Sequence, residues 1–91
     1  MKVLVIYDIH SSDTILNKLR KELKKYLYHV QFSVFEGVLS SHEILELEKW
    51  INKNINQEVD SVIMYKFKYF KEDNRIIFGL NKNDTMDTCL I

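Results

Sequence analysis

An aspartate at the end of an apolar run is the residue of this sequence best suited to chemistry. Asp8 directly follows the β-branched segment KVLVIY at Lys2–Tyr7 and precedes a short polar loop. A carboxylate at the end of a buried strand can bind Mg²⁺ through oxygen while the metal keeps its waters. Such a metal can polarise a phosphodiester and lower the pKa of water. The position also suits an aspartate that only caps its loop by accepting backbone amides, and the pattern leaves both roles open.

The remaining reactive side chains point away from several enzyme classes. His10 lies just after Asp8 and could assist proton transfer, although a solvated loop histidine is the commoner case. The three histidines and Cys89 show no zinc-ligand spacing. The sequence has neither a glycine-rich nucleotide loop nor a Gly-x-Ser-x-Gly motif. Zinc enzymes, P-loop enzymes and serine hydrolases are therefore not indicated.

Basic residues gather in one segment that also carries regularly spaced apolar residues. They are Lys18, Arg20, Lys21, Lys24 and Lys25. On one side of a helix they could bind the phosphates of a nucleic acid, but a solvated helix face shows the same pattern. Residues 65–71 alternate aromatic and basic side chains, which suits stacking on unpaired bases as well as a half-buried strand. Because the formal net charge is zero, long-range attraction to phosphate is weak.

The hydrophobic pattern predicts the elements that position these residues. Strands are expected at Lys2–Tyr7, Tyr28–Phe35, Ser61–Phe70 and Arg75–Leu80, and helices at 13–27 and 40–55. Asp13 is a plausible N-cap of the first helix. Ser40 and Glu43 form a capping-box pattern at the start of the second helix. Gly37 can supply the positive φ of a turn that ends the second strand.

This order of elements predicts an α+β, ferredoxin-like βαββαβ-type sandwich within a single domain over 1–91. The antiparallel sheet carries two helices on one face. An apolar C-terminal segment is expected to add a further strand at an exposed sheet edge, of the same chain or of a partner. A cytoplasmic protein is expected, because the sequence shows no membrane-spanning run, no secretory signal and no disulfide partner for Cys89.

The first strand predicts a homodimer because both of its faces are apolar. Its two faces carry Val3, Val5 and Tyr7 on one side and Leu4 and Ile6 on the other. Two helices can cover only one face of the sheet, so a second copy of the chain is the simplest cover for the other. If the strand lies near the two-fold axis, the two copies of Asp8 face each other, and two close carboxylates recruit a cation.

Three segments carry a more specific signal: VLVIYDI at 3–9, VQFSVFEGVLS at 30–40 and DSVIMYKF at 60–67. In order and spacing they resemble the signatures of the second CRISPR-associated protein family, the small subunit of the spacer-acquisition machinery. The resemblance implies a ferredoxin-like homodimer whose terminal strand crosses to the partner. It also implies a role in CRISPR adaptation, in which the dimer is a scaffold that bridges dimers of the integrase subunit and helps to set the length of captured DNA.

The resemblance also implies a site. Members of the family are described as metal-dependent endonucleases acting on RNA or DNA, and the metal here could be Mg²⁺ or Mn²⁺. Asp8 falls on the family's catalytic, metal-binding aspartate at the dimer axis. Tyr7 falls beside it and Phe35 on the matching aromatic residue, both as supporting residues of the site.

The chain departs from the family where arginines are common. The corresponding residues are Leu16 and Lys18 in the first predicted helix and His29 before the VQ pair. The forked donors that suit phosphate are therefore missing from these positions. Two other functions stay open from the sequence: a dimeric ribonuclease toxin of related fold, and a ferredoxin-like module that senses a small molecule.

Overall fold

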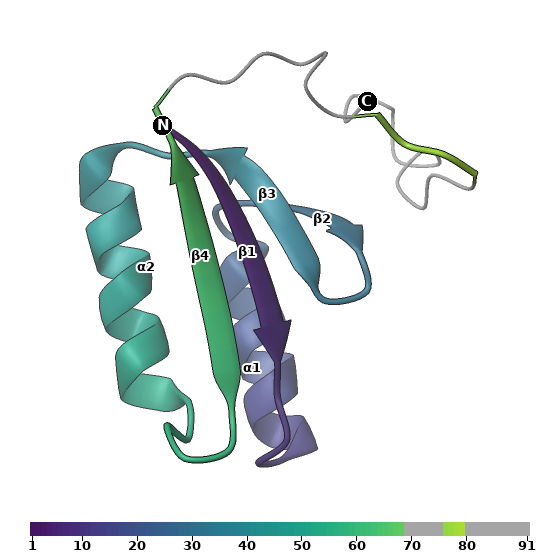
Figure 1. Ribbon diagram of the computed structural model, residues 1–91. Helices are drawn as coiled ribbons and strands as arrows, with labels where there is room; N and C mark the ends of the chain where they lie inside the picture. Colours follow the sequence, from purple (N-terminus) through teal and green to yellow (C-terminus); the bar gives the residue numbers. More distant parts are fainter. Residues whose placement is uncertain (69–75, 80–91) are drawn as a thin grey trace.

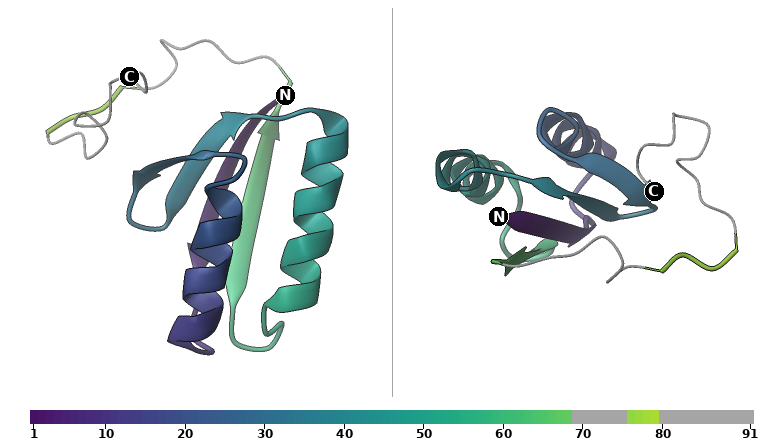
Figure 2. Two further views of the ribbon diagram at one scale, coloured as in Figure 1. Left: turned by 180° about the vertical axis from the view of Figure 1, so that it is seen from behind. Right: turned by 90° about the horizontal axis from the view of Figure 1, so that it is seen from above.

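The computed structural model describes residues 1–68 and 76–79. The elements in chain order are β1 (Lys2–Asp8), α1 (Asp13–Leu23), β2 (Tyr28–Gln31), β3 (Val34–Val38), α2 (Ser41–Asn54) and β4 (Ser61–Phe67). The strands form a four-stranded antiparallel sheet in the order β2-β3-β1-β4. Both helices lie on the same face of this sheet (Figures 1 and 2). The predicted α+β, ferredoxin-like sandwich is confirmed.

The central position of β1 follows from its continuously apolar sequence. β1 pairs with β3 along one side and with β4 along the other. Its residues Val3, Val5 and Tyr7 point toward the helices and are buried. The same layer holds the other buried apolar side chains of the core, which are Leu19, Leu23, Leu27, Phe35, Leu39, Ile44, Leu47 and Ile51. Full burial of each such side chain contributes about 1.5–3 kcal/mol, so this layer fixes β1 in the middle of the sheet.

The single strand predicted over Tyr28–Phe35 is wrong, because the chain reverses within it. The structure has two strands, β2 and β3, in which His29 pairs with Phe35 and Gln31 with Val34. The reversal takes place at Phe32, whose φ is 35°. Alternation of apolar and polar residues continues across a tight hairpin, and a phenylalanine gives no turn signal, so the pattern could not reveal the reversal.

The turn predicted at Gly37 is also wrong, since Gly37 lies inside β3. A Cβ atom at this position would stand 2.9 Å from Leu27 Cδ2 and 3.4 Å from Leu27 Cα. Contact distances between carbon atoms are normally about 3.5–4.0 Å. Glycine is therefore explained by the close packing of the segment after α1 on β3, and not by a turn.

The helix starts are close to those expected, with one correction. The N-cap of α1 is Ser12, whose side chain accepts the amide of Ile15, and Asp13 is the first helical residue. α1 ends at Leu23, four residues before the predicted end, because the following residues form turns. The capping box of α2 is confirmed, with Ser40 and Glu43 bonded reciprocally. None of the helices in the described ranges is long and apolar enough to cross a membrane.

The expectations for the C-terminal part are tested only in part. β4 ends at Phe67, and the last residues of the strand predicted to Phe70 lie outside the described residues. Of the strand predicted over Arg75–Leu80, residues 76–79 are described and lie in no strand. A strand needs a neighbour to pair its backbone groups, and within the described residues β4 pairs only with β1. The predicted terminal strand lies outside the described residues.

Candidate metal and nucleic-acid site

Asp8 stands at the end of β1 on the face of the sheet that carries no helix. It pairs with Ser61 of β4. Successive residues of a strand point to opposite faces, so Asp8 shares its face with Leu4 and Ile6. Its side chain is 73% exposed, and its Oδ1 lies 3.0 Å from His10 Nε2. The carboxylate is therefore open to solvent beside an apolar, uncovered sheet surface.

Asp60, immediately before β4, holds the loop that follows Asp8. Its carboxylate accepts the backbone amides of His10 and Ser11 at 2.8 and 2.9 Å. It also accepts the Ser11 hydroxyl at 2.7 Å and the Asn56 amide at 2.9 Å. Asp60 thus ties the loop between β1 and α1 to the loop between α2 and β4. The plain loop-capping role that the sequence left open for Asp8 is filled by Asp60, which leaves the Asp8 carboxylate to the open face.

The hydrogen bonds to Asp60 change its acidity. Burial acts to raise the pKa of this carboxyl, but the Ser11 hydroxyl and the amides of Asn56, His10 and Ser11 outweigh it and lower the pKa from 3.8 to about 2. Each of these donors bonds the ionised form, which is the form that a lowered pKa favours. Asp60 is therefore a structural carboxylate that stays charged in mild acid.

We expect Asp60→Asn to lower the stability and to remove part of its acid dependence. Because the folded pKa of about 2 lies below the unfolded value, the carboxylate stabilises the fold above about pH 4 and loses this effect as the pH falls toward 2. At pH 7 the variant should melt roughly 5–10 °C below the wild type. The difference should shrink between pH 4 and pH 2 in thermal melts.

Glu58→Gln is the matched control for this stability experiment. Glu58 is an exposed carboxylate in the same loop as Asp60. Its substitution should leave the melting temperature close to that of the wild type at each pH. Parallel curves for Asp60→Asn and the wild type from pH 7 to pH 2 would show that the Asp60 carboxylate does not stabilise the loop.

Tyr7 and Phe35, expected to support the site, lie on the opposite face of the sheet from Asp8. Both are buried beneath the helices, with ring centroids 6.2 Å apart. Phe35 also stacks on His29 at a centroid distance of 4.7 Å. These contacts fix β1 against β3 and so hold the strand that ends in Asp8. Neither ring is placed beside the Asp8 carboxylate.

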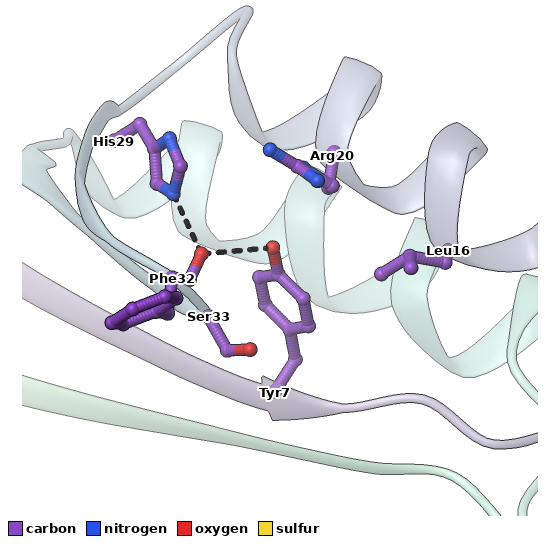
Figure 3. Close-up of a pocket in the computed structure, with 6 residues that line it drawn as sticks. All are labelled: Tyr7, Leu16, Arg20, His29, Phe32 and Ser33. Carbon is purple, nitrogen blue, oxygen red and sulfur yellow. Dashed lines mark hydrogen bonds between the residues drawn. The ribbon is translucent and has the colours of Figure 1, made fainter. Parts of the chain in front are cut away.

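The structure divides the predicted basic cluster of α1 into two groups. Lys18, Lys21 and Lys24 are exposed. Arg20 is half-buried and faces a pocket of about 300 Å³ between α1 and the β2–β3 turn, as Figure 3 shows. The lining residues are Tyr7, Leu16, Arg20, His29, Phe32 and Ser33. Sequence reasoning missed Ser33 and Phe32 as parts of a site, because only the hairpin brings them to α1.

The Tyr7 hydroxyl forms one wall of this pocket. It donates to the carbonyl oxygen of Phe32 at 3.4 Å, and His29 Nε2 lies 2.6 Å from the same oxygen (Figure 3). Burial raises the pKa of the Tyr7 hydroxyl, while the Arg20 charge and a hydrogen bond with the Ser33 side chain act in the opposite direction. The pocket therefore has a neutral hydroxyl opposite a guanidinium.

A divalent metal would find only part of its ligands in one chain. Within residues 1–68 and 76–79, no cluster of three or more histidine, cysteine, aspartate or glutamate side chains could hold a metal ion. On the open face, Asp8 offers a solvent-exposed carboxylate, whereas Glu36 is buried and pairs with Lys2. Mg²⁺ commonly binds through one or two carboxylates and several waters. The Asp8 carboxylate therefore fits such an ion as one of two protein ligands. A second copy of the chain would supply the other carboxylate.

Comparison with known proteins gives a consistent match over this fold. The family model described as CRISPR associated protein Cas2 matches residues 1–83. A CRISPR-associated endoribonuclease Cas2 of Methanocaldococcus jannaschii is 38% identical over 87 residues, which are 96% of this chain and 75% of that protein. A similarly named protein of Thermodesulfovibrio yellowstonii is 37% identical over 83 residues, which are 91% of this chain and 92% of that protein.

Solved structures are similar over the same range. The crystal structure of Streptococcus pyogenes Cas2 at pH 6.5 superposes with a TM-score of 0.77 and is 25% identical in sequence. The superposition covers 87% of this chain and 100% of that chain. A second crystal structure, described as cas2, gives a TM-score of 0.74 and 37% identity and covers 90% of each chain.

Proposed function

Because this chain belongs to the CRISPR associated protein Cas2 family, we propose that it is a metal-dependent endonuclease of CRISPR adaptation that works as a homodimer. The observation that carries this proposal is the place of Asp8, an exposed carboxylate at the end of β1 on the uncovered sheet face. The relatives are named endoribonucleases, which favours RNA as the substrate over DNA. The family match also favours this function over a ribonuclease toxin or a small-molecule sensor.

The uncovered sheet face supports the homodimer. Opposite the helices, Leu4 and Ile6 of β1 pair with Tyr65 and Ile63 of β4 and share their face. Ile63, Tyr65 and Phe67 are all exposed in the single chain. A contiguous apolar patch of this kind marks an interaction surface. A two-fold, self-complementary contact between two such faces would cover it and bring the two copies of Asp8 to one end of the interface.

The chemistry follows from what Asp8 and its loop can do. Mg²⁺ or Mn²⁺, when bound, would polarise a phosphodiester and lower the pKa of a water molecule. Asp8 of each protomer would supply a carboxylate oxygen, and the pair would share the ion that relieves their repulsion. His10 lies 3.0 Å from the Asp8 carboxylate, where it could orient that group and give a proton to the leaving oxygen. Asp60 fixes the backbone of His10 and so its position.

A scaffold role in the spacer-integration complex is compatible with the same structure. We propose that the dimer binds the CRISPR integrase subunit and a DNA backbone. The exposed lysines Lys18, Lys21 and Lys24 support this role. In the described part of the chain they form no ion pair with a carboxylate, whereas Lys25 pairs with Glu22. Unpaired lysines on one helix are available to phosphates. This role does not require the Asp8 carboxylate, so the Asp8→Asn variant separates scaffold from nuclease.

Metal removal tests the proposed activity directly. We expect EDTA to reduce cleavage of a labelled single-stranded RNA by at least about 100-fold, because a metal-activated water is needed. Added Mg²⁺ or Mn²⁺ in excess should restore the rate, and a labelled double-stranded DNA should be cleaved more slowly. The measurement is the rate of product formation on a denaturing gel. Cleavage that persists unchanged in EDTA would contradict the metal-dependent mechanism.

A further inference from the structure

The pocket between α1 and the β2–β3 turn lies on the helix side of the sheet (Figure 3), whereas Asp8 lies on the other face. We propose that it binds one nucleotide unit of a single-stranded nucleic acid, with a phosphate beside Arg20 and an unpaired base on Phe32. The inference rests on the proposed nucleic-acid function for its class of ligand. It concerns the face of the sheet opposite to Asp8.

The charge of the pocket favours a phosphate. Arg20 faces the pocket, and among the described residues its guanidinium pairs with no carboxylate. Three lysines of the described residues form ion pairs outside the pocket: Lys2 with Glu36, Lys25 with Glu22 and Lys66 with Glu48. The lining residues include no acidic side chain. A planar guanidinium binds phosphate oxygens through paired donors, so an anion is the ligand that this wall suits.

The opposite wall adds neutral donors. The Tyr7 hydroxyl bonds the Phe32 carbonyl at 3.4 Å, which is beyond the usual range for an O–H donor. His29 Nε2 lies at 2.6 Å from that carbonyl and can satisfy it, so the Tyr7 hydroxyl can turn to another acceptor. The Ser33 side chain lines the same wall. A phosphate between the walls would accept from Arg20 on one side and from the two hydroxyls on the other.

Phe32 supplies the second observation. Its φ of 35° lies in the left-handed region, which a bulky residue adopts only under strain and which glycine or asparagine adopts readily. Its side chain is 68% exposed, so core packing does not account for a phenylalanine here. A strained residue at the mouth of a pocket points to a function. An exposed aromatic ring beside a phosphate site suits the stacking of an unpaired base.

Binding of short oligonucleotides in EDTA tests the inference, since cleavage is then absent. The probe is a fluorescent single-stranded hexanucleotide, as RNA and as DNA, and the readout is anisotropy. We expect Arg20→Gln to weaken binding of either strand by at least about 10-fold, and Arg20→Lys to weaken it less, because the charge stays but the fork is lost. The matched control is Lys53→Gln on α2, an exposed lysine that does not line the pocket, which should cost about 3-fold or less.

Phe32→Asn tests the base platform and keeps the experiment decisive if an Arg20 variant is unstable. It should weaken binding by about 10-fold or more through lost stacking. Its melting temperature should equal or exceed that of the wild type, because asparagine relieves the left-handed strain. A duplex of the same sequence should bind more weakly than the single strand. Equal affinity for duplex, equal losses for Arg20→Gln and Lys53→Gln, or no wild-type binding at about 100 μM would each overturn the inference.

Asp8→Asn separates the failure of this inference from the failure of the proposed function. In EDTA this variant should bind the hexanucleotide as tightly as the wild type, since Asp8 lies on the other face of the sheet. Intact Arg20-dependent binding without any cleavage would leave the pocket in place and reject the nuclease. Normal cleavage together with binding that does not depend on Arg20 would support the nuclease and reject the pocket.

Discussion

Asp8→Asn will reduce metal-dependent cleavage by at least about 100-fold while the protein stays folded and dimeric. Asparagine keeps the shape of the side chain but offers only a neutral oxygen, which is a poor ligand for Mg²⁺. Because Asp8 is 73% exposed and bonds only His10 within the described residues, the melting temperature should change by no more than about 3 °C. The rate on labelled RNA with saturating Mg²⁺ and the thermal melt are the two measurements.

Asp13→Asn is the matched control for the cleavage experiment. It makes the same chemical change at another exposed aspartate, at the first residue of α1. It should retain the wild-type rate within about 2-fold. Full, EDTA-sensitive cleavage by Asp8→Asn would show that the carboxylate is not a ligand of the catalytic metal.

Mixed dimers sharpen the same prediction. If both copies of Asp8 share one metal, only dimers with two intact copies are active. Equal amounts of wild type and Asp8→Asn are refolded together and compared with wild type alone at the same total protein concentration. One quarter of the dimers then carry two intact copies, so the activity should fall to about one quarter. Independent sites in each protomer would leave about one half. Activity that is linear in the wild-type fraction would therefore reject the shared site.

Ile63→Lys will convert the proposed homodimer into a monomer at micromolar concentration. Ile63 pairs with Ile6 at the middle of the uncovered sheet face and is 46% exposed in the single chain. In the dimer, an ammonium group there would be buried without a partner, which should raise the dissociation constant by at least about 100-fold. Sedimentation velocity over a range of concentrations measures the change. Cleavage should be lost with the dimer, because the two copies of Asp8 then separate.

Leu45→Lys is the control for dimerisation. Leu45 is 49% exposed, almost the same as Ile63, but it lies on α2 in the helix layer. Its substitution should leave the dimer and the cleavage rate unchanged. A monomeric wild type at micromolar concentration, or a dimer that tolerates Ile63→Lys as well as Leu45→Lys, would contradict the sheet-face homodimer.

Much of the fold could be predicted because local patterns determine it. The run at Lys2–Tyr7 predicted a strand, and the capping box at Ser40 predicted the start of α2, both as observed. The hairpin at Phe32 could not be predicted, since its residue type opposes the backbone conformation that it adopts. The strand position of Gly37 goes with the close packing of Leu27 on β3, which no local pattern reports.

The sequence by itself determined the family, the α+β order of elements, the strand-end carboxylate at Asp8 and the apolar character of both faces of β1. These are properties of short segments, where residue type and spacing are sufficient. Only the tertiary structure decided which aspartate caps the loop, because Asp60 lies 50 residues from the His10 amide that it accepts. It also decided that Arg20 faces a pocket formed with the β2–β3 turn. Such pairings depend on how distant segments pack, and spacing along the chain carries no record of them.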